Sequence, residues 1–469
     1  MKTFNANSAG QITLKAVLIG AMILVMLIPV AMLQSMIRER MEYQKEVETE
    51  IGSTWGGPQT VTGPVLVLPY AVISGEGDKK TTQKGTAYFL PEKLDIQGDI
   101  HTEVRSRTAH KVLLYKSELA FDGLFTQPPI ESLGLKPENI LWNESYLYIG
   151  ISHLQGVQNR LSVTYDGVNY ADAMPVKNNE LTGSGLAIRI PIHPLPETIT
   201  GERQIPFRFN LDLHGTGSLF FIPVGKETTS RLQSEWETVS FTGNYLPGNR
   251  SFENGFAADW KVFDFNRSYP QAWLNDKYGI SSEYNPKEYS YTDESPLTQS
   301  AFGVDLRFPL DHYQLAMRSV KYAVMFIALT FFVFFLVELL SQRRIHPVQY
   351  LLVSCGLVLF YSLLLALSEH IGFDWAYLVS AVAIIVLITS YSGSIFKNRR
   401  QTLRMGLFLT ALYAYLYVML QLEDMALLFG SVGLFLALAI IMYVSRKVNW
   451  YKNGNEPPTQ EKQLKTPTE

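Results

Sequence analysis

Ionisable residues beside long apolar runs are the first candidates for chemistry in this 469-residue chain. Glu338 lies near the end of one run, and Glu369 and His370 close another, a few residues before Asp374. Ionisable groups are costly within a membrane, so they tend to face a polar interior and often serve a function. Glu369 and His370 could together relay a proton. All of them lie at the ends of runs, where side chains reach water, and interfacial anchoring is the favoured alternative.

A second candidate is the aromatic-rich segment GFAADWKVFDFNRSYPQAW, from Gly255 to Trp273. It combines Trp260 and Trp273 with cations, among them Arg267. Aromatic faces beside cations offer a binding surface for a glycan or a peptide. The favoured alternative is a strand and loop that pack on a sheet core, with Arg267 in a surface ion pair.

The stretch TWGGPQTVTGPVLVLPY, from Thr54 to Tyr70, follows the first apolar run. Its Gly-Gly-Pro sequence predicts the end of a helix, because helix interiors tolerate glycine and proline least. The apolar residues that follow predict a strand buried on both faces. We therefore interpret this stretch as a structural entry into a β-domain. A binding role for Trp55 is the alternative.

The remaining patterns do not match a known class of enzyme. The single cysteine, Cys355, excludes a disulfide framework and a cysteine-based zinc site. The chain lacks the HExxH, Walker A and Gly-x-Ser-x-Gly motifs. Its net charge of -3 gives no indication of a nucleic-acid partner. The sequence predicts no catalytic residue, no metal and no cofactor, and we expect a non-enzymatic protein.

Six apolar runs are long enough to cross a bilayer, since a spanning helix needs roughly 20 residues. The first run is too long for the core of a signal peptide, so an uncleaved anchor is expected. The six predicted spans are residues 16–37, 322–340, 348–368, 375–396, 405–422 and 425–445.

Basic residues in the short loops predict the orientation of the chain. Lys and Arg occur in the loops after the second and fourth runs and in the tail after the sixth, but are absent from the other two loops. Under the positive-inside rule this alternation places both termini in the cytoplasm. Residues 38–318 then form one exported insert, which is periplasmic if the source is a Gram-negative bacterium. Residues 1–15 form a cytoplasmic N-terminus, and residues 446–469 form a polar, disordered tail.

The exported insert consists of short alternating runs bounded by Gly, Pro, Asn and Asp, the pattern of strands and turns. KVLLYKSELAFDGLF and RFNLDLH are examples. The expected fold is a bundle of six transmembrane helices, with a large antiparallel, sandwich-like all-β domain inserted between the first and second helices.

Several stretches together resemble the CreD family of bacterial inner-membrane proteins. They are WGGPQTVTGPVLVLPY, SLFFIPVGKETTSRLQSEW, SFTGNYLP, GFAADWKVFDFNRSYPQAW, FGVDLRFPLDHYQ, FFLVELLSQRRIHPVQYLLV and LLLALSEHIGFDWAY. The resemblance covers nearly the full length. It implies an inner-membrane protein linked to cell-envelope integrity, to a two-component regulatory system and to β-lactam stress. It carries over no catalytic residue.

Two functions remain open. In the first, the β-domain of a non-enzymatic envelope protein binds or senses a ligand, which is an envelope protein, peptidoglycan or a lipid. In the second, a membrane enzyme or transporter acts on a lipid or cell-wall intermediate through Glu338, Glu369 and His370. We favour the first, because no catalytic motif is present and the exported insert is large. The bilayer is the expected surrounding, and the number of helices favours assembly with a partner or into an oligomer.

Overall fold

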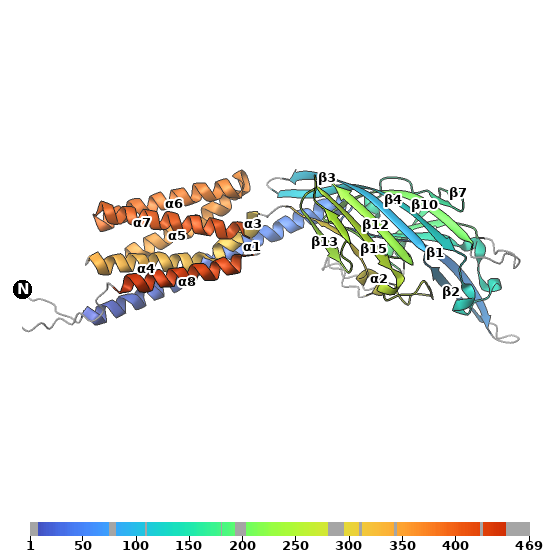
Figure 1. The fold of residues 1–469 in the computed structure, drawn as a ribbon, viewed down its shortest axis with the longest axis horizontal. Coiled ribbons are helices and arrows are strands. Elements are labelled where there is room, and N and C mark those ends of the chain that lie inside the picture. The colour runs from blue at the N-terminus through green and yellow to red at the C-terminus, as the bar shows by residue number, and fades with distance from the viewer. Residues whose placement is uncertain are drawn as a thin grey trace, which may run out of the picture. The chain divides into compact units, whose positions relative to one another are not determined.

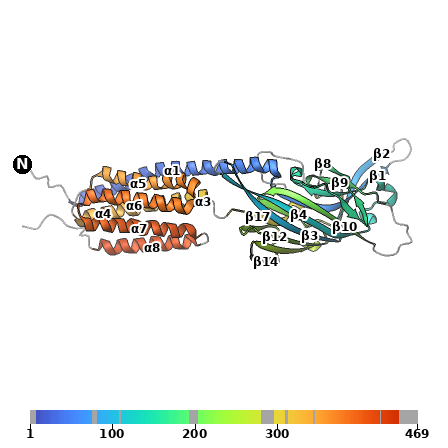
Figure 2. The same cartoon turned by 90° about the horizontal axis from the view of Figure 1, so that it is seen from above.

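The computed structural model describes residues 8–74, 81–107, 110–179, 181–192, 203–279, 295–308, 312–341, 345–422 and 425–446. The chain divides into two compact units (Figures 1 and 2). The helical unit comprises Met1–Tyr43 and Leu310–Glu469, and the β unit comprises Gln44–Pro309.

The first helix, α1 (Ser8–Trp55), contributes to both units. Its apolar part includes Pro29, which spanning helices tolerate. The helix ends as its sequence predicts. The N–H groups of Gly56 and Gly57 both donate to the carbonyl of Gly52, at 2.8 and 2.6 Å. Gly56 has a φ of +148°, and a Cβ there would lie 2.4 Å from the carbonyl oxygen of His214. Glycine is therefore required at this helix end.

The rest of the helical unit, as far as the structure describes it, is a series of six helices, visible in Figures 1 and 2. Two of the N-termini are capped by side chains, His346 before α5 and Asn398 before α7, which accept hydrogen bonds from backbone N–H groups. The helices are α3 (His312–Lys321), α4 (Ala323–Ser341), α5 (Pro347–Ile371), α6 (Phe373–Phe396), α7 (Arg399–Gln421) and α8 (Ala426–Ser445).

Among the described residues, four helices are long and apolar enough to cross a membrane. They are α1, α5, α6 and α7, and a fifth span results if α3 and α4, bent by 43°, are counted together. The apolar part of α8, Leu428–Tyr443, is shorter. The sequence prediction of six spans included α4 and α8 as full spans. It also left most of α3, up to residue 318, within the insert, because the polar residues of α3 give a weak hydropathy signal.

The β unit consists of two sheets. The first has the order β13 (Val239–Gly243), β17 (Phe302–Leu306), β11 (Ser218–Ile222), β1 (Gln59–Ser74), β5 (Tyr146–Ile151), β9 (Gly183–Arg189) and β8 (Ala173–Asn179). Outside this order, β2 (Thr81–Phe89) pairs with β1 and with β16 (Ala272–Leu274). The second has the order β14 (Asn249–Ser251), β15 (Phe256–Phe263), β12 (Glu227–Ser234), β3 (Lys93–Arg107), β4 (His110–Thr126), β10 (Gln204–Thr216), β6 (Val163–Tyr165), β7 (Val168–Tyr170). We call them sheet A and sheet B.

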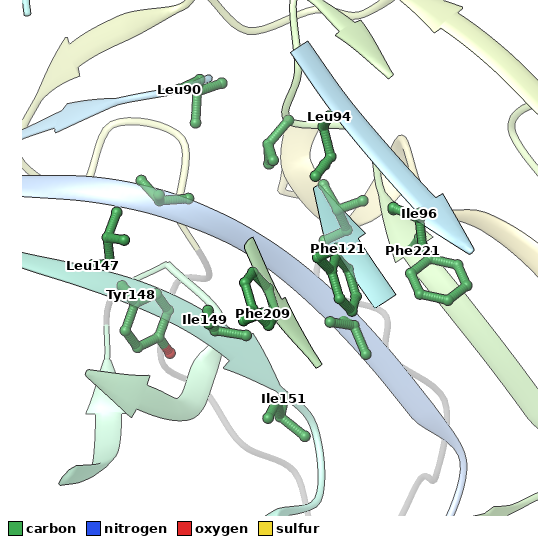
Figure 3. Packing of buried hydrophobic residues seen from close by; sticks show 14 of the residues in the cluster. Leu90, Leu94, Ile96, Phe121, Leu147, Tyr148, Ile149, Ile151, Phe209 and Phe221 are labelled. Carbon is green, nitrogen blue, oxygen red and sulfur yellow. The ribbon is translucent and has the colours of Figure 1, made fainter. Parts of the chain in front are cut away.

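Sheet A and sheet B share one hydrophobic core, shown in Figure 3. Strand β10 alternates buried and exposed residues, as expected for a sheet with one face in water. Strand β1 is buried almost throughout, as predicted from its unbroken apolar run. Aromatic rings join the layers. Phe121 stacks on Phe209 of the same sheet, with ring centroids 4.5 Å apart, and its ring also lies 6.2 Å from that of Phe221 in sheet A.

Among the described strands, two pairs are parallel, which the expected antiparallel sandwich did not include. Strand β1 pairs in parallel with β11, and β3 pairs in parallel with β12. The partners are far apart in sequence, so no local turn signal announces the pairing. A pattern of alternating residues identifies a strand, but it does not identify the neighbour of that strand.

Candidate functional site

Glu338 is the centre of a buried polar network in the helical unit. Its side chain is 9% exposed and forms an ion pair with Lys15 of α1. It also accepts a hydrogen bond from the hydroxyl of Tyr350 and one from the N–H of Ile345, both at 3.0 Å. The ammonium of Lys15 donates in addition to the carbonyl of Ile345, at 2.8 Å. The carboxylate is therefore fully paired, and it connects α1, α4 and the N-terminal end of α5.

The sequence did not reveal Lys15 as part of this site. It was placed in the cytoplasmic N-terminus, which was expected to end at residue 15. The sequence does contain a signal for this site, because Lys15 is the last charged residue before a long uncharged run. A cation in that position needs an acidic partner when the run packs against other helices.

Glu369 also has partners within the helical unit. Its carboxylate accepts a hydrogen bond from the hydroxyl of Tyr313, at 3.0 Å, and lies 3.8 Å from Nε of Arg40. His370 is exposed, and no hydrogen bond joins it to Glu369 in the described part of α5. Adjacent residues of a helix point in different directions. The structure therefore does not bring these two side chains together as a relay.

Asp374 sits in the first turn of α6 and accepts hydrogen bonds from two residues near the end of α7. The donors are the hydroxyl of Tyr417 and the amide of Gln421, each at 3.0 Å. This arrangement connects the beginning of one helix to the end of the next. Its geometry is that of an anchoring contact.

Trp55 lies in a compact cluster of cations and rings in the β unit. Its ring stacks on His214, with centroids 4.3 Å apart and planes 7° apart. The guanidinium of Arg105 lies over the Trp55 ring at 4.3 Å. The indole N–H donates to the carbonyl of Tyr115 at 3.3 Å. Cation–π and stacking contacts of this kind fix the last residue of α1 to strands β3, β4 and β10.

The surroundings of His214 in this cluster lower its pKa and so favour the neutral imidazole. Burial lowers the pKa of His214, and the nearby charges of Lys116 and Arg105 lower it further. Glu103 offsets part of this effect, since it pairs with Arg105 at 2.9 Å and with Lys116 at 3.5 Å. Neither His214 nor Arg105 was identified from the sequence, because strand pairing alone brings them next to Trp55.

Trp260 and Trp273 are core residues. Trp260 is 2% exposed, its N–H donates to the carbonyl of Tyr245 at 3.2 Å, and its ring packs edge-on against Phe241. Trp273 is 3% exposed and stacks on Tyr88, with centroids 5.5 Å apart. Neither ring is available at the surface of the β unit in this structure.

Arg267 is buried, so the surface ion pair suggested for it is wrong. The residue follows the 3-10 helix η6 (Asp264–Asn266), in the connection between β15 and β16. Its guanidinium donates to the carbonyl of Tyr269 at 2.7 Å and lies over the Tyr269 ring at 4.4 Å. Burial lowers the pKa of Arg267. The sequence alone could not distinguish this position from an exposed loop.

A cavity of about 600 Å³ opens on sheet B, lined by residues of β3, β4, β6, β10 and β12. Asp95 and Asp122 are direct partners in the register of β3 and β4, so their side chains are neighbours. Thr229 donates its hydroxyl to Asp95, and Arg208 pairs with Asp122. Carboxylates, a guanidinium and a hydroxyl thus converge on one hollow, where they can hydrogen-bond a polar ligand. In the part of the chain that the structure describes, no group of side chains is arranged to hold a metal ion.

Comparison with known proteins identifies the family. The family model described as "Inner membrane protein CreD" matches residues 11–451. The inner membrane protein CreD of Escherichia coli (strain K12) is 31% identical over 439 residues, which cover 92% of each chain. An N-terminal apolar helix, a large β unit and further apolar helices suit a protein of the membrane. The chain belongs to the CreD family of inner membrane proteins.

Proposed function

We propose that this chain is a non-enzymatic inner-membrane protein that supports the integrity of the cell envelope under β-lactam stress. Its β unit is the binding or sensing module, and its helices anchor that module. The observation that carries the proposal is the cavity on sheet B, where Asp95, Asp122 and Arg208 converge. The partners of Glu338 and Glu369 support the same proposal, because hydrogen-bonded and ion-paired carboxylates fit an anchoring role.

The proposal includes an orientation. Six spans place both termini in the cytoplasm and the β unit in the periplasm. The support is the distribution of Lys and Arg residues along the chain. They follow α4, α6 and α8, and they are absent from the connections between α5 and α6 and between α7 and α8. Single cysteines in a Cys355→Ser background test it. A membrane-impermeant maleimide added to intact spheroplasts should label Arg250→Cys and spare Asn398→Cys, and the reverse pattern would contradict the orientation.

The functional test uses cells that lack their own copy of the gene and are grown with a β-lactam. Thr164 is exposed on β6 and lines the cavity, and a tryptophan there should fill it without disturbing the strand. We expect Thr164→Trp to lose protection at normal protein levels. Asn249→Trp is the matched control, an exposed strand position on β14 outside the cavity lining, and it should protect as wild type does.

The alternative, a membrane enzyme or transporter that acts on a lipid or cell-wall intermediate, is tested in the same cells. It requires Glu369→Gln and His370→Ala to abolish protection at unchanged protein levels. If those variants fail while Thr164→Trp protects, the binding proposal is replaced by the membrane one. Normal protection by both membrane variants removes the support that the sequence gives to the alternative.

A further inference from the structure

Arg267 has a guanidinium group that is only half satisfied. Nη1 donates to the carbonyls of Tyr269 and Pro270, at 2.7 and 3.4 Å. Nε and Nη2 are buried and have no hydrogen-bond partner in the structure. The residue is 9% exposed, and none of the ion pairs among the described residues includes it.

A buried cation without a counter-charge is unfavourable. Removing one partner from a buried ion pair costs roughly 3–5 kcal/mol, because the remaining charge is uncompensated. Asp264 is near enough to affect Arg267 electrostatically, but Oδ1 of Asp264 accepts its hydrogen bond from the N–H of Phe265, at 2.9 Å. Asp264 makes no hydrogen bond to Nε or Nη2 of Arg267, since both nitrogens lack a partner.

The two free nitrogens define a specific shape. Nε and Nη2 lie on one edge of the planar guanidinium, and that edge matches the two oxygens of a carboxylate in a bidentate pair. The opposite side is held in place. Nη1 is bonded to two carbonyls, and the Tyr269 ring below it is fixed by its own hydroxyl, which contacts the carbonyl of Pro223 and Oγ of Ser300, each at 2.9 Å. The Nη1 side of the guanidinium is thus held in place.

Further unpartnered polar atoms occur in the same short segment. Oε1 of Gln271 and the indole N–H of Trp273 are also buried without a hydrogen-bond partner. Native structures leave only a few such groups per hundred residues, and each calls for an explanation such as strain, a functional role, or a bound water or ion. Four of these atoms lie within the seven residues from Arg267 to Trp273, which sets this segment apart from the rest of the described β unit.

We propose that the Nε–Nη2 edge of Arg267 binds a carboxylate group of a ligand of the β unit. The inference rests on the proposed binding function and names the chemical group that the unit recognises. A single guanidinium matches the single charge of a carboxylate. Lys261, six positions earlier in the chain, is already paired with Glu227, at 2.8 Å, so it does not provide a second charge for a phosphate dianion. Because both nitrogens are shielded, the loop must open for binding, and association is slow.

The test uses the purified full-length chain in detergent, with sodium acetate as the probe and sodium chloride at equal ionic strength as the reference. Bound acetate stabilises the folded state by mass action, so the unfolding temperature should rise with acetate and saturate. Arg267→Gln should lose the acetate-dependent rise, and Arg267→Lys should lose most of it, because lysine lacks the fork. Arg250→Lys, at an exposed arginine of β14, should keep the full rise.

Comparing the two salts within each variant separates binding from any loss of stability caused by the substitution. If Arg267→Gln does not fold, binding is measured by the line broadening of ¹³C-acetate instead. Saturable broadening with the wild type that is absent with Arg267→Lys would support the carboxylate site. No rise in the wild type, an equal rise in every variant, or a rise with sodium phosphate alone would each overturn the carboxylate site. Such a failure leaves the protection assay with Thr164→Trp unaffected, so it is distinguishable from failure of the proposed function.

Discussion

The ammonium group of Lys15 lies against the carboxylate of Glu338, 323 positions further along the chain. The pair joins the first helix of the chain to α4 inside the helical unit. The side chain of Lys15 is 23% exposed and that of Glu338 is 9% exposed. This contact therefore specifies a position for α1 that apolar packing alone would leave free to slide or rotate.

Breaking this pair from one side should be costly. We expect Lys15→Met alone to destabilise the helical unit by about 3 kcal/mol, because it leaves a buried carboxylate without its cation. Glu338→Gln should cost less, since the amide oxygen still accepts from the N–H of Ile345 and the amide NH2 can donate to the hydroxyl of Tyr350. The double variant should lose less than the sum of the two single variants. Thermal unfolding in detergent measures this coupling, and strictly additive losses would show that the two residues do not interact.

The end of α1 should tolerate no side chain at Gly56. A Cβ there would approach the carbonyl oxygen of His214 to 2.4 Å, so Gly56→Ala should destabilise the β unit by about 3 kcal/mol. Gly134 also has a positive φ, of +73°, but its Cβ would meet open space. Gly134→Ala should therefore cost only about 1 kcal/mol. Urea unfolding of both variants measures the loss of stability. Equal losses at Gly56 and Gly134 would mean that backbone strain alone, and not the contact with His214, causes the effect.

The β unit should become less stable as the pH falls below 6.5. Burial lowers the pKa of His153 and of His214 below their ordinary value of 6.5. The unfolded chain then binds protons before the folded chain does, so stability is full above pH 6.5 and decreases toward the lower, folded pKa values. Urea unfolding between pH 8 and pH 5 should show this decrease, and His214→Gln should make the slope shallower. A slope that is unchanged in that variant would contradict the assignment to His214.

The aromatic segment from Gly255 to Trp273 should divide into core and surface positions. Trp260→Ala removes a fully packed ring and should cost about 4 kcal/mol. Phe265 lies five positions further along and is 78% exposed, so Phe265→Ala should change stability by less than about 0.5 kcal/mol. Chemical denaturation followed by circular dichroism compares the two variants. Similar losses at both positions would mean that the segment packs differently from this structure.

Local signals in the sequence identified features that depend on local physics. Gly56, Gly57 and Pro58 stop α1 because of backbone conformation, and this could be predicted without the rest of the fold. The alternation of apolar residues identified strands such as β10, and the unbroken apolar run identified β1 as buried on both faces. The long apolar helices were equally evident, because hydropathy is a property of a continuous segment.

Features that depend on pairing between distant segments could not be predicted. Arg267 looks like an exposed loop cation, and only the packing of Tyr269 and Pro270 around it shows that it is buried. Asp95 and Asp122 become neighbours through the register of β3 and β4, which no motif encodes. Trp260 and Trp273 were chosen as candidates for their residue type, and both are core residues. The residues that contact Trp55 were not predicted.

The parallel pairs of sheets A and B determine when the β unit can complete its folding. Strand β1 needs β11, and β3 needs β12, whose contacting residues Asp95 and Thr229 are 134 positions apart. Strand β17 then pairs with both β11 and β13, near the end of the insert. Contacts between such distant segments form slowly, since long loops must close first. A chain still being synthesised therefore exposes edges of β1 and β3 until residue 234 has emerged, and edges of β11 and β13 until residue 306 has emerged. This interval is when chaperones and proteases have access to it.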